Sequence, residues 1–354
     1  MLLNQNFASL ERSGAAVDHS GEALAKLFGG HDLAAAEAEA LFGSLVDGAL
    51  NEAQIAAMLV ALRLKGETGD ELIGAARALR AADTDFDRPD YDFADTCGTG
   101  GDGSGSINVS TAVAFVAAAA GLPIAKHGNR SFTSRCGSAD VLEALGADLS
   151  PSSAVSRRAL DQTGFCFLFA PLYHPGLKHA GPARRALKVR TIMNLLGPCL
   201  NPAEPPVQLL GVADPSLLEP IARTLESLGV RSALVVHGGG LDEIALHAET
   251  EAVRIDAGTL TRMTITPESV GLSRAAVDSV KGGEPHENAA RLKALLLGHA
   301  PSADRDVVAL NAGALLFAAG LTTDLREGVA LALDTIRSGA GHKVLTGFVE
   351  ASRG

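Results

Sequence analysis

Short apolar runs alternate with helical segments over most of the chain beyond residue 90. The runs have the length of buried strands, and the segments between them carry apolar residues at helical spacing. Such alternation predicts a largely parallel sheet with helices on both faces. Beyond Ile255, the pattern predicts turn-rich strands followed by helices. The expected strands are Phe93–Cys97, Ile124–His127, Phe165–Ala170, Val207–Ala213 and Ala233–His237, and the expected helices are Ala112–Ala120, Ser138–Leu145, Ser152–Thr163, Ser216–Leu228, Pro285–Leu297, Asp306–Ala319 and Thr323–Ser338.

The chain before residue 83 has helical spacing of apolar residues and reads as short antiparallel helices. Asp32, Asn51 and Thr68 are of the residue types that cap helix N-termini. The polar segment 83–90 reads as a linker. We therefore expect a lead-in at 1–20, a helical domain at 21–90 that also offers a dimer face, and a large α/β domain at 91–354.

Composition narrows the range of partners. The 354 residues carry a net charge of −11, with two Tyr and no Trp, which argues against nucleic acid as a partner. No apolar run is long enough to span a membrane, and the N-terminus lacks the pattern of a secretory signal. The four cysteines have no C-x-x-C spacing, so we expect free thiols in a reducing cytoplasm.

The stretch 95–111 is the strongest candidate for chemistry. It places five glycines and three serines between an expected strand and an expected helix. A strand, a glycine loop and a helix start together present backbone N–H groups to an anion, so we favour phosphate binding over a simple tight turn. Asn108, Ser110 and Thr111 suit a helix cap, and their side chains are equally suited to contact a ligand.

Two familiar phosphate loops do not match this stretch. A P-loop needs a Lys followed by Ser or Thr, and the loop contains no Lys. Gly98, Gly100 and Gly103 match the spacing of a dinucleotide fingerprint, but no Asp or Glu lies between Gly103 and Asp140, where the ribose-binding acid would stand. A phosphate-rich ligand is therefore a better fit than a nicotinamide cofactor.

Further polar segments follow other expected strands. Lys126 to Arg130 places two cations and His127 together and reads as a second phosphate-contacting loop. Asp242 and Glu243 follow three glycines, and carboxylates opposite a phosphate loop favour a Mg²⁺ site over a solvated turn. Arg184 and Arg185 are expected to open a helix, where they would oppose its dipole and favour an anionic partner.

Taken together, these segments resemble anthranilate phosphoribosyltransferases over almost the whole chain after residue 20. The resemblance implies a homodimer with a nucleoside phosphorylase-like phosphoribosyltransferase fold: a small helical domain and a large α/β domain with a mainly parallel sheet. The matching segments are Gly98-Thr-Gly-Gly-Asp102, Asn108-Val-Ser-Thr111, Lys126-His-Gly-Asn-Arg130, Cys136-Gly-Ser-Ala-Asp140, Arg190-Thr-Ile-Met-Asn194 with Leu196-Gly-Pro198, and Gly240-Leu-Asp-Glu243.

The resemblance also implies an activity and site residues. The expected reaction transfers the phosphoribosyl group of phosphoribosyl pyrophosphate to the amine of anthranilate, in tryptophan biosynthesis. Arg184, Asn129 and His127 are the expected catalytic residues, and Gly98, Asn129 and Arg184 would hold anthranilate. Ser110, Asp242 and Glu243 would ligate a pair of Mg²⁺ ions per subunit. The phosphoribosyl donor would contact Gly98, Gly101, Asp102, Ser106, Asn108, Val109, Ser110, Thr111, Lys126, His127, Gly128, Asn129, Arg130, Ser131, Phe132, Thr133, Ser134 and Ser138.

Two other functions remain open at this stage. A pyrimidine nucleoside phosphorylase-like enzyme would share the architecture and use phosphate as its nucleophile. A relative without enzymatic activity would keep the fold and bind nucleic acid, which the net acidity disfavours. The chain departs from the family pattern at Thr96-Cys97, Phe132-Thr133 and Cys136, and these changes leave the glycine, hydroxyl and charged positions intact.

Overall fold

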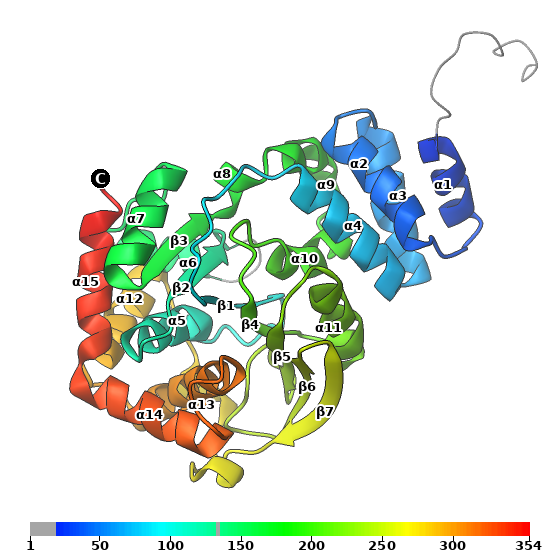
Figure 1. Ribbon diagram of the computed structural model, residues 1–354. Helices are drawn as coiled ribbons and strands as arrows, with labels where there is room; N and C mark the ends of the chain where they lie inside the picture. The colour runs from blue at the N-terminus through cyan, green and yellow to red at the C-terminus, as the bar shows by residue number, and fades with distance from the viewer. Residues whose placement is uncertain (1–18, 132–134) are drawn as a thin grey trace, which may run out of the picture.

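The computed structural model describes residues 19–131 and 135–354. A bundle of helices lies beside a larger body built on a sheet (Figure 1). The bundle buries the apolar stripes of its helices, including Phe42 and Met58. Gly74 lets α4 approach α2, because a Cβ at this position would lie 2.1 Å from the carbonyl oxygen of Ala35. The bundle comprises α1 (His19–Phe28), α2 (Ala35–Val46), α3 (Glu52–Lys65) and α4 (Gly69–Ala81).

Two of the three expected helix caps are confirmed. Asn51 accepts a hydrogen bond from the backbone N–H of Gln54 at 3.0 Å, and Thr68 accepts one from that of Glu71 at 3.3 Å. The expected cap at Asp32 is wrong, since α2 begins only at Ala35. The Asp32 carboxylate instead accepts a hydrogen bond from the Lys65 ammonium at 2.7 Å.

The sheet has seven strands in the order β3-β2-β1-β4-β5-β6-β7. The first five strands of that order are mutually parallel, and β6 and β7 continue the sheet as an antiparallel hairpin. The largely parallel sheet predicted from the alternating pattern is therefore confirmed. The strands are β1 (Ala94–Gly98), β2 (Ile124–Gly128), β3 (Phe165–Phe169), β4 (Val207–Gly211), β5 (Ser232–Gly238), β6 (Thr250–Asp256) and β7 (Thr259–Ile265).

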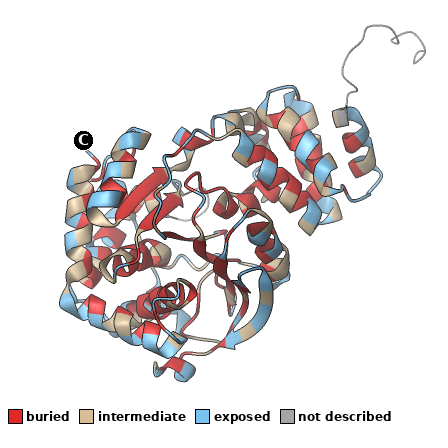
Figure 2. Cartoon of the chain, in the orientation of Figure 1, coloured by how far each residue is buried: buried red, intermediate tan, exposed pale blue. Residues whose placement is uncertain are grey.

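Helices cover both faces of the sheet. Its five parallel strands are largely buried, whereas β7 at the edge is largely exposed (Figure 2). One face packs against α5, α6 and the C-terminal helices, with Phe115 and Leu234 fully buried between them. The other face packs against α10 and α11, and its apolar core continues into the helical bundle. The helices are α5 (Val109–Ala119), α6 (Ser138–Ala144), α7 (Ser153–Thr163), α8 (Ala170–Tyr173), α9 (Gly181–Leu187), α10 (Ile192–Leu196), α11 (Leu218–Ser227), α12 (Pro285–Leu296), α13 (Ser302–Ala318), α14 (Leu325–Ser338) and α15 (Ala340–Ala351).

The last helix, α15, was not expected from the sequence. It packs on α5 and α7 through residues such as Phe348, whose ring stands edge-on to that of Phe165 at 4.7 Å. The division of the chain at residue 90 stays a prediction. Across the described residues, no helix has both the length and the apolar character that crossing a membrane requires.

Candidate active site

Four of the parallel strands end in glycine at the same edge of the sheet, namely β1 at Gly98, β2 at Gly128, β4 at Gly211 and β5 at Gly238. Gly98 lies directly opposite Gly211 in the register of the β1–β4 pair. The strand order reverses between β1 and β4, and ligands of open α/β sheets bind at such a point, beyond the carboxyl ends of the strands. The glycine loop, the basic loop and the carboxylate segment therefore share one rim, as predicted.

The carboxylate segment crosses this rim in close contact with the strand ends. A Cβ on Gly98 would lie 2.2 Å from Asp242 Oδ2, and one on Gly211 would lie 1.6 Å from the Asp242 carbonyl oxygen. Asp242 Oδ2 accepts a hydrogen bond from the backbone N–H of Gly100 at 2.6 Å. The glycines at both strand ends thus allow a carboxylate to lie against the glycine loop.

Charged groups gather beside this crossing, with Lys126 buried and Asp242 and Glu243 half-buried. Burial and the nearby Asp102 raise the pKa of Asp242 to about 7. Burial and the nearby Asp242 raise the pKa of Glu243 well above its usual range, opposed by Lys126 and by the backbone N–H of Ser110. Lys126 is 1 % exposed, and its ammonium donates to the carbonyl of Thr96 at 2.5 Å and to the Ser110 hydroxyl at 3.3 Å.

These residues fit a hard cation. The carboxylates of Asp242 and Glu243 and the hydroxyl of Ser110 are oxygen donors of the kind that Mg²⁺ prefers, and burial is the main cause of the raised carboxyl pKa values. Within residues 19–131 and 135–354, no three His, Cys, Asp or Glu side chains converge as a complete metal cage. This agrees with the usual habit of Mg²⁺, which takes one or two carboxylates and completes its shell with water and substrate phosphates.

The glycine loop is held from two sides. Arg190 donates hydrogen bonds to the carbonyls of Gly100 and, at 3.3 Å, of Thr99. Gly101 has φ +74°, and its position leaves no room for a Cβ beside the Arg190 guanidinium. On the other side, the N–H of Gly282 donates to the carbonyl of Gly105 at 2.7 Å. The sequence pointed to the loop, and the structure adds these two supports.

The start of α5 differs from the expectation of a side-chain cap. Asn108 occupies the cap position, but its side chain makes no capping hydrogen bond. Its amide donates to the carbonyl of Cys136 at 3.1 Å and accepts from the amide of Asn288 on α12 at 2.9 Å. Asn288 was not anticipated, because no local pattern connects a residue 180 positions away to this loop. Thr111 is fully buried, and among the described residues its hydroxyl has no hydrogen-bond partner.

The basic loop after β2 is only partly free for a ligand. Arg130 pairs with Glu143 at 2.7 Å and with Asp140 at 3.2 Å, so its charge is already engaged. The Ser138 hydroxyl donates to the carbonyl of Asn129 at 3.3 Å and lies where a Cβ on Gly128 would overlap it. Three predicted contacts of the phosphoribosyl donor, Phe132, Thr133 and Ser134, lie outside the described residues. Ser106 lies in the glycine loop, Val109 begins α5, and Ser131 lies in the basic loop after β2.

Arg184 and Arg185 lie in the last turn of α9, so the expectation that they open a helix is wrong. Their positive charge there matches the helix dipole instead of opposing it. The dipole of α9 therefore gives no reason to expect an anionic partner for Arg184, whereas the burial of Arg184 does. Arg184 is half-buried, burial lowers its pKa, and no acid among the described residues pairs with it. A half-buried guanidinium without a counter-charge favours binding of a carboxylate.

His127 has a partner that sequence reasoning missed. Its Nε2 lies 2.9 Å from Nε2 of His174, and Nδ1 of His174 lies 2.5 Å from a carboxylate oxygen of Asp83. Both histidine residues are 6 % exposed. Burial and His174 lower the pKa of His127 well below its usual range, so the ring is neutral at pH 7.

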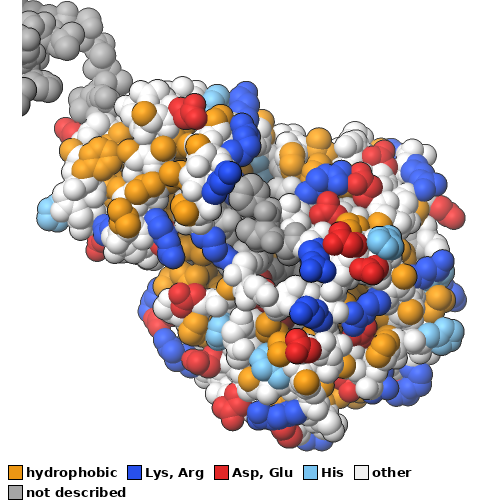
Figure 3. Space-filling view, turned by 180° about the vertical axis from the view of Figure 1, so that it is seen from behind, with side chains coloured by type: hydrophobic (Ala, Val, Ile, Leu, Met, Phe, Trp, Pro, Cys, Tyr) orange, Lys and Arg blue, Asp and Glu red, His pale blue; other side chains and the backbone are white. Residues whose placement is uncertain are grey.

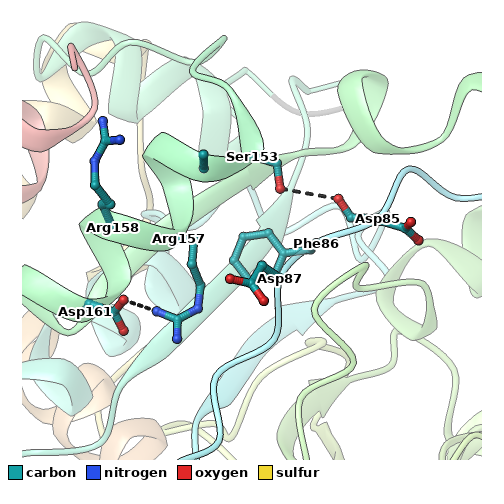
Figure 4. Close-up of a pocket in the computed structure, with 8 residues that line it drawn as sticks. Asp85, Phe86, Asp87, Ser153, Arg157, Arg158 and Asp161 are labelled. Carbon is teal, nitrogen blue, oxygen red and sulfur yellow. Dashed lines mark hydrogen bonds and ion pairs between the residues drawn. The ribbon is translucent and has the colours of Figure 1, made fainter.

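A separate pocket of ≈ 650 Å³ lies between the linker and α7. Figure 4 shows the Ser153 hydroxyl bonded to Asp85 and Arg157 paired with Asp161. None of the predicted site residues lines it, so the candidate site remains at the glycine-rich rim.

The helical bundle, the α/β body and the phosphate-type rim together define a glycosyl transferase. Residues 90–342 match the family model "Glycosyl transferase family, a/b domain", and residues 21–82 match its "helical bundle domain". A protein of Sorangium cellulosum is 59% identical over 92% of this chain and 94% of its own length. A protein of Vibrio cholerae is 47% identical over 90% of this chain and 95% of its own length. Both bear the name anthranilate phosphoribosyltransferase, and the chain belongs to this family.

Solved structures agree with this assignment. The crystal structure of anthranilate phosphoribosyltransferase from Thermus thermophilus matches with a TM-score of 0.89 and 44% identity, over 94% of this chain and 99% of that one. The Saccharomyces cerevisiae enzyme in complex with PRPP and Mg matches with a TM-score of 0.87 and 25% identity, over 96% of this chain and 99% of that one.

We predict that Gly211→Ala destabilises the protein by about 2 kcal/mol, because its Cβ would overlap the Asp242 backbone and displace the carboxylate segment. Urea denaturation measures the change. Gly43→Ala on α2 is the matched control, since a Cβ there meets nothing within 4 Å and alanine favours a helix. Equal stability of the two variants would contradict the close crossing.

Proposed function

We propose that this chain, with Mg²⁺, transfers the phosphoribosyl group of phosphoribosyl pyrophosphate to the amine of anthranilate and releases pyrophosphate. The observation that carries the proposal is the meeting, at one rim, of a glycine loop with buried Lys126 and the carboxylates Asp242 and Glu243. The names of the relatives support the same reaction. The four free cysteine thiols of this chain suit a reducing cytoplasm, where we place the enzyme.

The donor would lie along the glycine loop and the start of α5. Backbone N–H groups of the loop and the N-terminus of α5 favour the negative charge of phosphate groups. Lys126 would contribute a buried positive charge. Ser110, Asp242 and Glu243 would hold Mg²⁺, and a pair of ions per subunit fits a donor with several phosphates. When bound, the metal stabilises negative charge that develops on the departing pyrophosphate.

The acceptor would lie between the basic loop and α9. Arg184 would pair with the anthranilate carboxylate, and Asn129 with Gly98 would border the ring and amine. In the reaction, the amine nitrogen bonds to C1 of the ribose while the bond from C1 to the pyrophosphate oxygen breaks. The oxygen keeps the electron pair, and the nitrogen then loses a proton. An aromatic amine is uncharged at pH 7, so the main tasks of the protein are orientation and charge stabilisation.

A homodimer through the helical domain completes the proposal. Phe28 at the end of α1 and Leu64 at the end of α3 are 60% and 82% exposed, large values for apolar side chains. Figure 3 shows hydrophobic side chains gathered over this part of the molecule. An apolar surface of this kind is typical of a contact between subunits.

The decisive experiment follows anthranilate fluorescence in a mixture of protein, anthranilate, phosphoribosyl pyrophosphate and Mg²⁺. We expect the fluorescence to fall only when all components are present. If the fluorescence does not change, while a pyrimidine nucleoside and phosphate are converted to the free base and ribose 1-phosphate, the chain is a phosphorylase instead.

We predict that Arg184→Ala raises KM for anthranilate by about tenfold to a hundredfold, because a charged hydrogen-bonding partner of the carboxylate is lost. KM for the phosphoribosyl donor should stay near its original value. Steady-state kinetics with each substrate varied in turn measure both. The neighbouring exposed residue supplies the control Arg185→Ala, and equal effects of Arg184→Ala on both substrates would defeat the assignment.

We predict that Asp242→Asn combined with Glu243→Gln abolishes activity and weakens Mg²⁺ binding, because the donor set loses its charged oxygens. Calorimetric titration of Mg²⁺ in the presence of phosphoribosyl pyrophosphate measures binding independently of turnover. Glu249→Gln changes an exposed carboxylate nearby and serves as control. An unchanged titration in the double variant would remove the metal role.

A further inference from the structure

Asn288 on α12 joins the C-terminal part of the body to the start of α5. This residue is 3% exposed. The backbone N–H of Gly283 donates to Asn288 Oδ1 at 2.8 Å, and Asn288 Nδ2 donates to Asn108 Oδ1 at 2.9 Å. Asn108 Nδ2 in turn donates to the Cys136 carbonyl at 3.1 Å. Two side-chain amides thus connect the beginnings of α12 and α5 to the segment before α6.

The direction of these hydrogen bonds is fixed at both ends by backbone groups. The N–H of Gly283 can only donate, so the oxygen of the Asn288 amide faces it. The carbonyl of Cys136 can only accept, so the nitrogen of the Asn108 amide faces that carbonyl. The remaining atoms, Asn288 Nδ2 and Asn108 Oδ1, are then a matched donor and acceptor. The Cys136 thiol gives Asn108 Oδ1 a second, weaker donor at 3.4 Å.

A second asparagine at a helix start shows what the Asn108 side chain would do without these partners. Asn51 precedes α3 with ψ 167°, and its side chain accepts a hydrogen bond from the Gln54 backbone at 3.0 Å. Asn108 precedes α5 with ψ 69°, and its side chain makes no such bond. The residue type is the same, so the partners of the side chain account for the difference. The N–H groups in the first turn of α5 are left without a side-chain cap, and the helix itself offers them no carbonyl.

We infer that Asn288 is a positioning residue for the phosphoribosyl donor, which holds the Asn108 side chain away from α5 and leaves the first turn of this helix open to a phosphate group. The inference rests on the proposed function for the identity of the ligand, whereas the orientation of Asn108 can be tested without it. Uncapped N–H groups at a helix N-terminus bind phosphate through hydrogen bonds and the helix dipole. A capping Asn108 side chain would compete with the ligand for the same N–H groups.

The segment that carries Asn288 is fixed to the glycine loop on one side and to α13 on the other. Ser106 and Lys281 form an antiparallel bridge between the loop and this segment. Arg291, one turn beyond Asn288, donates to the Lys281 carbonyl and to both carboxylate oxygens of Asp304, the latter at 2.9 and 2.5 Å. The side chain of Asp304 is 1% exposed, so α12 is anchored in the core. Asn288 therefore reaches Asn108 from a fixed position.

The crystal structure of Asn288→Leu tests the orientation of Asn108. Leucine keeps the branched shape of the side chain but cannot donate, so we expect Asn108 Oδ1 to turn and accept from the backbone N–H of Thr111, as Asn51 does from Gln54. An Asn108 side chain that still bonds to Cys136 and leaves α5 uncapped would overturn the inference. If leucine prevents folding, Asn288→Ser, whose side chain is too short to reach Asn108, gives the same test.

Kinetics test the effect on the donor. Asn288→Leu should raise KM for phosphoribosyl pyrophosphate about fivefold to tenfold, because a helix cap then competes with the ligand, and leave KM for anthranilate unchanged. Leu292→Ala, at a buried apolar side chain one turn further along α12, is the matched control. It should lower stability in urea without changing either KM. Equal changes in both KM values, or the same rise in the control, would reduce Asn288 to a packing role.

Removing the Asn108 side chain supplies a second kinetic test. Once Asn108→Ala has removed the group that Asn288 holds, adding Asn288→Leu should not raise KM for the donor further, since residues that act through one contact are not additive. The cycle subtracts the effect of Asn108→Ala itself. A full additional rise would overturn the inference. If the unchanged chain transfers no phosphoribosyl group, the proposed function fails, and the crystal structure of Asn288→Leu alone decides how Asn108 is held.

Discussion

The close approach of the Asp242 segment to the ends of β1 and β4 is the constraint on which the site depends. Parallel strands normally end in side chains that keep other segments at a distance. Glycine at both Gly98 and Gly211 removes this barrier, and Asp242 then accepts a hydrogen bond from the loop beyond β1. A phosphate-type loop and a pair of carboxylates thereby come together, although about 140 residues separate them in the chain.

This arrangement concentrates opposite charges where water is scarce. Lys126 is buried, and its ammonium is held by a backbone carbonyl and by Ser110 rather than by an acid. The carboxyl groups of Asp242 and Glu243 have raised pKa values because each is desolvated and lies beside another carboxylate. A site of this kind is incompletely neutralised on its own, which suits a ligand that brings both phosphate and a divalent cation.

Local patterns in the sequence were sufficient for the parallel sheet, the glycine loop and the rim of polar loops, because apolar spacing and glycine content report directly on backbone geometry. They failed where a side chain's role depends on distant neighbours. Asp32 is of a residue type that caps helices, but its carboxylate accepts a hydrogen bond from Lys65 instead. Asn108 stands at the cap position of α5, but its side chain bonds to Asn288 and not to the helix backbone. Placing Arg184 correctly required knowing where α9 begins and ends, and a run of basic residues between prolines does not define those limits.

The hydrogen bonds from Asp83 through His174 to His127 show that the linker also contacts the α/β body. By composition, segment 83–90 is a polar connection between two domains, yet Asp83 is hydrogen-bonded to His174, whose Nε2 lies 2.9 Å from Nε2 of His127 on β2. The apolar core likewise continues from the helical bundle through α10 to the sheet. Helix α9, which carries Arg184, also packs against α3 of the bundle. A fragment that begins after residue 90 would lack Asp83 and with it the hydrogen bond to His174.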